Sequence, residues 1–80
     1  MKHIVELTDT FGGQANYSWA HRHTLDDTDR LTERALVRRA KALVGLNGVP
    51  GKGLWVGETY EFRPYGALWI MFIYLDDSDD

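Results

Sequence analysis

The feature that most constrains the fold is a run of nine apolar or aromatic residues, ALWIMFIYL, at positions 67–75. This run is far shorter than the roughly 20 residues that a membrane-spanning helix needs. In a sheet with one dry face, the residues of a strand alternate between apolar and polar. Here both alternating sets are apolar, which predicts a central strand with both faces covered.

Three further segments have the alternation of strands. Residues 3–9 and 16–25 alternate on either side of Gly12 and Gly13, a pattern that predicts an antiparallel hairpin. Residues 54–63 alternate as a third strand. A turn at residues 63–66, RPYG, then leads into the apolar run as the fourth strand.

Residues 27–46 predict the single helix. Leu36, Ala40 and Leu43 fall on one apolar stripe at helical spacing, and either Gly45 or Gly48 ends the helix. We therefore expect an α+β domain of order β-β-α-β-β, in which a four-stranded antiparallel sheet carries one helix packed on one face. The domain covers residues 1–75, and residues 76–80 form an acidic disordered tail.

Composition narrows the class of protein. Eighty residues make one small domain, and the absence of cysteine excludes disulfides and thiolate metal sites. The N-terminal segment lacks the pattern of a signal peptide, so we expect a cytoplasmic protein. The net charge is −3, yet five cations and one glutamate give residues 30–41 a charge of +4, which leaves −7 on the rest.

This uneven distribution of charge gives two candidate surfaces for binding a partner. A basic ridge is expected along the helix, where it could contact phosphates, although the pI of about 5.5 argues against direct nucleic-acid binding. The basic ridge comprises Arg30, Arg34, Arg38 and Lys41. The acidic candidates for binding a protein partner are Asp26, Asp27, Asp29, Glu58, Glu61, Asp76 and Asp77.

The histidines supply an alternative metal site. His21 and His23 lie on one face of the second strand, and His3 is expected across from them on the first. Three imidazoles could hold zinc, with water as the fourth ligand. The plainer interpretation places them as rim residues beside Trp19. The chain has no catalytic constellation, so we expect neither an enzyme nor a cofactor, and no metal in the preferred interpretation.

The apolar run also predicts self-association. Burying one large apolar side chain stabilises a protein by about 1.5–3 kcal/mol, so an uncovered row of them would be costly for a small domain. We expect a second copy of the chain to cover the sheet face away from the helix, giving a homodimer. The alternative is that residues 45–53 or the first turn fold over this face. If the RPYG turn is a two-residue hairpin loop, the expected dimer face comprises Trp55, Leu68, Ile70, Phe72 and Tyr74. In the other register, the uncovered residues of this strand are Trp69, Met71, Ile73 and Leu75.

Two segments carry a resemblance to a known group of proteins. VELTDTFGGQANYSWAHRHTL and ERALVRRAKALVGLNGVPG resemble small proteins of phages and prophages, similar in size and style to anti-CRISPR inhibitors of type I systems, with the type I-C inhibitors as one candidate group. The resemblance implies a stoichiometric inhibitor in a bacterial host cell, which docks on the Cascade complex and blocks its engagement of target DNA. It transfers no functional residue. The alternative functions are a small metal-binding or nucleic-acid-binding accessory protein.

Overall fold

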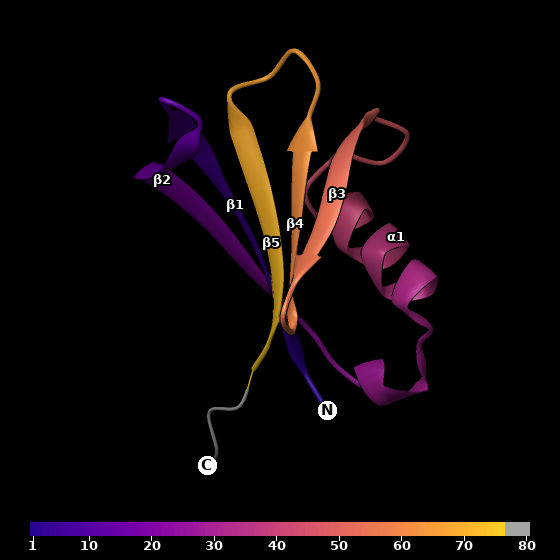
Figure 1. The fold of residues 1–80 in the computed structure, drawn as a ribbon. Coiled ribbons are helices and arrows are strands. Elements are labelled where there is room, and N and C mark those ends of the chain that lie inside the picture. Colours follow the sequence, from indigo (N-terminus) through magenta and orange to yellow (C-terminus); the bar gives the residue numbers. More distant parts are fainter. Residues whose placement is uncertain (77–80) are drawn as a thin grey trace.

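The computed structural model describes residues 1–76 as one antiparallel sheet with a single α-helix (Figure 1). The strands follow the order β2-β1-β5-β4-β3 across the sheet. The elements along the chain are β1 (His3–Phe11), β2 (Gln14–Leu25), the 3-10 helix η1 (Thr28–Arg30), α1 (Glu33–Leu43), β3 (Gly51–Val56), β4 (Thr59–Pro64) and β5 (Trp69–Leu75).

The prediction of a four-stranded β-β-α-β-β sheet is wrong, because the expected third strand is a hairpin. A turn at Gly57 and Glu58 separates β3 from β4, and Val56 pairs with Thr59 across it. Gly57 has a φ of 62°, which glycine adopts without the steric cost of a Cβ atom. In a single strand, Trp55 and Tyr60 would point to opposite faces of the sheet. With the turn between them they are paired across the hairpin, and both point to the same face.

The prediction that the apolar run forms a central strand is confirmed. β5 pairs with β1 on one side and with β4 on the other. Ile73 lies opposite both Val5 and Tyr60, while Phe72 lies opposite Glu6 and Glu61. Alternate residues of β5 therefore face the helix and the opposite side, which we call the open face.

The helix is shorter than the predicted residues 27–46. It begins after Thr32, whose side-chain oxygen accepts a hydrogen bond from the backbone N–H of Ala35 at 3.1 Å. Arg30 belongs to η1, and the extended backbone of Leu31 separates it from α1. The basic ridge therefore loses Arg30. No helix within residues 1–76 is long and apolar enough to cross a membrane.

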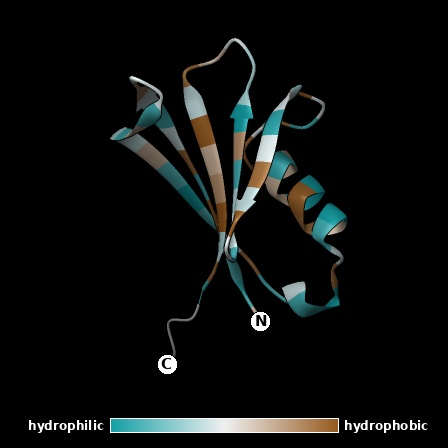
Figure 2. Ribbon diagram, viewed as in Figure 1, coloured by the Kyte–Doolittle hydropathy of each residue, from teal (hydrophilic) through white to brown (hydrophobic). Residues whose placement is uncertain are grey.

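The core lies between α1 and the middle of the sheet. Leu36 and Ala40 of α1 are buried with apolar residues of the central strands, among them Phe62 and Met71. Figure 1 shows α1 beside the β3 end of the sheet, away from β2, most of whose residues are exposed. In Figure 2, hydrophobic colour marks β5 and alternates with hydrophilic colour along α1.

The end of the β1–β2 hairpin is joined to β4 by a hydrogen bond. The Arg63 guanidinium on β4 donates a hydrogen bond to the carbonyl oxygen of Gly13 at 2.6 Å, although β1 and β4 are separated by β5. Ile70 of β5 is 1% exposed and lies outside the helix-side core. The bond from Arg63 brings the first turn toward β4 across β5, and the alternative that this turn folds over the open face stays a prediction.

Candidate functional site: a cationic and aromatic groove

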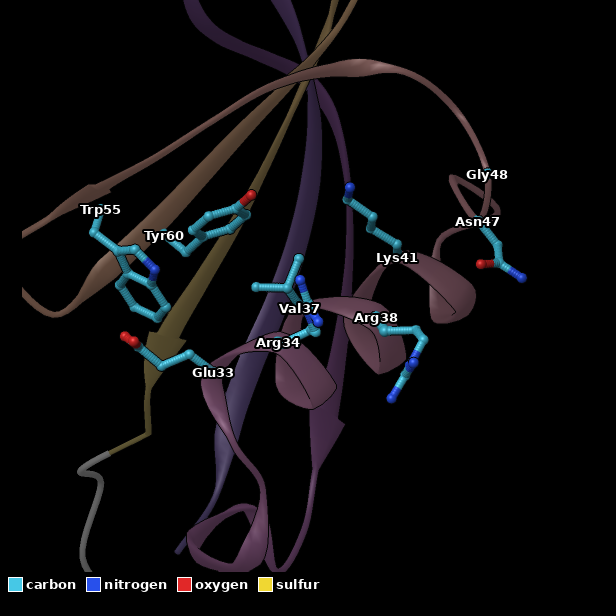
Figure 3. Close-up of a pocket in the computed structure, with 9 residues that line it drawn as sticks. All are labelled: Glu33, Arg34, Val37, Arg38, Lys41, Asn47, Gly48, Trp55 and Tyr60. Carbon is cyan, nitrogen blue, oxygen red and sulfur yellow. The ribbon is translucent and has the colours of Figure 1, made fainter.

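A groove of about 440 Å³ lies between α1 and the β3–β4 hairpin (Figure 3). Its volume falls in the range of about 300–1,000 Å³ that is usual for small-molecule sites. In Figure 3, basic side chains extend from α1 while Trp55 and Tyr60 stand on the facing hairpin. The lining consists of Glu33, Arg34, Val37, Arg38, Lys41, Asn47, Gly48, Trp55 and Tyr60.

Three cations give the groove its charge. Arg34, Arg38 and Lys41 are four and three residues apart, so one face of α1 carries all of them. None of the three forms an ion pair with a carboxylate of residues 1–76. The Lys41 ammonium nitrogen lies 3.9 Å from the centroid of the Phe62 ring, a cation–π contact. With Glu33 as the carboxylate of the lining, the local charge is about +2.

Two aromatic rings form the opposite wall. The centroids of Trp55 and Tyr60 are 5.2 Å apart, with their planes tilted by 58°. Both rings are partly buried and pack against the core. Burial raises the pKa of the Tyr60 hydroxyl above its ordinary value. The prediction that Trp55 lies on the open face is wrong, because the turn at Gly57 shifts the alternation by one position.

Sequence reasoning missed this groove because it interpreted residues 54–63 as one strand. The signal that could have found it is the dipeptide Gly57-Glu58, which can close a two-residue turn. A hairpin at that point brings Trp55 and Tyr60 onto one face. That face is also the one beneath the helix.

The structure does not bring the three histidines together as a metal site. His21 pairs across the sheet with Leu7 and His23 with Val5, whereas His3 pairs with Leu25. The Nδ1 atom of His3 lies 2.6 Å from the hydroxyl oxygen of Thr28, and burial together with the adjacent N-terminal charge lowers the pKa of His3. Within residues 1–76, no group of three or more potential ligands is placed to hold a metal ion.

Most of the acidic candidates gather at the end of the molecule that contains the N-terminus, η1 and the β3–β4 turn (Figure 1). Asp29 lies 3.6 Å from the N-terminal amine, and Asp26 lies 3.9 Å from the Lys2 ammonium. Asp27 lies between them in the chain, Glu58 lines the same hollow as Met1, and the backbone N–H of Asp76 donates to the Lys2 carbonyl. Glu61 instead lies in mid-sheet. Asp77 and the predicted disordered tail fall outside the described residues, apart from Asp76.

The expected dimer face is not continuous. Phe72 and Tyr74 are half-buried on the open face, but Ile70 is covered within the chain. Leu68 is 74% exposed and precedes β5, while Trp55 lies on the helix side. The prediction that these five residues share one open surface is wrong. The homodimer itself stays a prediction.

The open face also carries a buried carboxylate that sequence reasoning did not single out. The side chain of Glu6 is 6% exposed. It accepts a hydrogen bond from the Tyr17 hydroxyl at 3.1 Å and forms an ion pair with the Arg22 guanidinium. Tyr17 reaches Glu6 because its backbone, with a φ of 57°, interrupts the alternation of β2.

Compared with known proteins, the chain matches no family model, no curated protein and no solved structure. The resemblance to anti-CRISPR inhibitors therefore stays an expectation drawn from the sequence.

Proposed function

We propose that this chain is a non-catalytic binding protein that holds a single strand of nucleic acid in the groove between α1 and the β3–β4 hairpin. The observation that carries the proposal is that Arg34, Arg38 and Lys41, none of which forms an ion pair within residues 1–76, line one groove together with Trp55 and Tyr60. Cationic side chains attract backbone phosphates, and every base can stack on an aromatic ring. This combination is typical of proteins that bind single strands.

A single strand suits the groove better than a duplex. Bases that are paired and stacked within a duplex do not present their faces to a tryptophan. The rest of the chain carries a negative charge, and the exposed acids at the N-terminal end would repel a second row of phosphates. The same negative charge limits affinity, so binding should be modest and sensitive to salt.

The inhibitor of a host nucleoprotein machine is a second proposal, with the type I Cascade complex as its first candidate target and the bacterial cytoplasm as its location. It is supported by the sequence resemblance and by the acidic end of the molecule, which suits a lysine-rich DNA channel. A pull-down with purified Cascade, followed by a DNA-binding assay, tests it. Capture of the complex with loss of DNA binding would support this role, and failure to capture any Cascade would remove it.

The nucleic-acid proposal is tested by fluorescence anisotropy with a labelled all-thymidine strand of about ten nucleotides, within the usual site sizes of small single-strand binders. Three phosphate contacts predict a slope of about −2 for the logarithm of the binding constant against the logarithm of salt concentration. A hairpin duplex of the same length serves as the comparison and should bind more weakly. Absence of binding at low salt, or equal binding of the duplex, would contradict the proposal.

A further inference from the structure

A second hollow of about 530 Å³ adjoins the groove and shares Glu33 and Trp55 with it. It lies toward the N-terminal end of the chain and the β3–β4 turn. In Figure 3, the Glu33 carboxylate extends toward the Trp55 ring. The lining consists of Met1, His3, Glu33, Trp55, Gly57, Glu58 and Leu75.

The two hollows differ in chemistry on either side of Trp55. The first holds the cations Arg34, Arg38 and Lys41. The second is lined by Glu33 and Glu58, together with His3 and with Met1, whose amine lies 3.6 Å from Asp29. Carboxylates repel phosphate but accept hydrogen bonds from N–H groups. A nucleotide whose phosphate lies in the first hollow and whose base stacks on Trp55 therefore presents its base edge to Glu33 and Glu58.

The four bases differ in what they offer a carboxylate. Guanine presents two parallel N–H donors on its Watson–Crick edge, which match the two oxygens of one carboxylate. Cytosine and adenine each present one amino group next to an acceptor nitrogen. Thymine and uracil present a single N–H between two carbonyl oxygens, which a carboxylate repels. The pairing is therefore best for guanine and worst for thymine and uracil.

We infer that the second hollow reads the base, and that a guanine stacked on Trp55 is the preferred occupant, held by the carboxylates of Glu33 and Glu58. This inference rests on the proposed function, since the groove must first hold the phosphate. A good bidentate contact to a base discriminates by about 1–3 kcal/mol, so one guanine should strengthen binding roughly tenfold over thymine.

The test is a competition between two labelled strands of about ten nucleotides, a usual length for such sites. One is all thymidine and the other carries a single central guanosine, which prevents quadruplex formation. The wild-type protein should prefer the guanosine strand about tenfold. The variants Glu33→Gln and Glu58→Gln should bring this ratio close to one, because an amide offers one acceptor oxygen and its N–H₂ group faces the guanine donors. Both side chains are exposed, so the fold should tolerate either change.

The outcomes separate the two proposals. If neither strand binds at low salt, the proposed function fails. If both strands bind equally, the single-strand proposal stands and the base-reading inference is overturned. A preference that survives in both variants would also overturn it, because the carboxylates would then not be the groups that read the base.

Discussion

The Tyr60 ring lies directly over Gly53 on the helix side of the β3–β4 hairpin. A Cβ atom placed on Gly53 would fall 1.8 Å from the Tyr60 hydroxyl oxygen and 2.6 Å from the ring carbon that bears it. Phe62 lies over Gly51 in the same way, with a ring carbon 2.6 Å from the corresponding Cβ position. Gly53 therefore provides the space in which Tyr60 of the aromatic wall packs, and Gly51 provides space for the core residue Phe62 and for the backbone of Arg63.

Replacing Gly53 with alanine should force the Tyr60 ring out of its position. Overpacking of this kind costs about 1–3 kcal/mol, which exceeds the gain of about 0.4–1 kcal/mol from a less flexible unfolded chain. Urea unfolding should show the loss, and single-strand binding should weaken with it. The exposed neighbour Lys52 is the control, because Lys52→Ala adds no atom beneath the ring. A Gly53→Ala protein with wild-type stability and binding would show that Tyr60 is not held by this contact.

Replacing Arg22 with methionine should destabilise the protein, because within residues 1–76 it leaves the buried Glu6 carboxylate with only the Tyr17 hydroxyl as its partner. An under-satisfied buried group costs about 1–3 kcal/mol. Adding Glu6→Gln to the same protein removes the unpaired charge and should recover part of the loss. Arg39→Met is the control, since Arg39 forms no ion pair with residues 1–76. Urea midpoints for wild type, Arg22→Met, Glu6→Gln, the double variant and Arg39→Met provide the measurement, and additive effects of the two single changes would rule out coupling between Glu6 and Arg22.

Asp9 should make stability depend on pH in the acid range. Hydrogen bonds from the Ser18 hydroxyl and the Asn16 amide lower the pKa of the Asp9 carboxyl below its ordinary value of 3.8. The contribution of Asp9 is therefore present above the unfolded pKa and is lost as the pH falls below about 4. Asp9→Asn removes the contribution of this carboxylate to stability. The urea midpoint of the variant should therefore fall less steeply than that of the wild-type protein as the pH is lowered. Parallel profiles for the two proteins would show that Asp9 does not contribute.

The predicted homodimer can be tested without unfolding the chain. Phe72 lies between Glu6 and Glu61 on the open face, so the ammonium group of Phe72→Lys would have carboxylates beside it. Light scattering should give a dimeric mass for the wild-type protein and a folded monomer for this variant. Ile70→Lys should instead unfold the chain, because Ile70 is 1% exposed. A monomeric wild-type protein would refute the dimer.

The sequence predicted most of what depends on local periodicity. The first hairpin, the central position of residues 67–75 and the apolar stripe of α1 follow from the alternation and spacing of side chains. The β3–β4 turn was missed because the alternation continues on both sides of Gly57, so one long strand and two short ones have nearly the same pattern. Trp55 was consequently assigned to the wrong face.

The remaining differences arise from contacts between residues far apart in the chain. The bulge in the β1–β2 hairpin, where the register shifts between Thr8 and Thr10, pairs His3 with Leu25, past both of the other histidines. The bond from Arg63 to Gly13 joins residues fifty positions apart. Neither the bulge nor this bond can be recognised from the alternation or spacing of residue types in the sequence.

The most direct measurement is a salt-dependent anisotropy titration of a single strand with two charge-reversal variants, Arg34→Glu in the groove and Arg39→Glu outside it. Both arginines are exposed on α1. The negative charge of Arg34→Glu would lie near the start of the helix, where it interacts favourably with the positive end of the helix dipole, so this change should not destabilise α1. Arg34→Glu should weaken binding about tenfold or more at low salt and reduce the salt slope by about one, while Arg39→Glu should change both much less. Equal losses in the two variants, or none in either, would contradict binding in this groove.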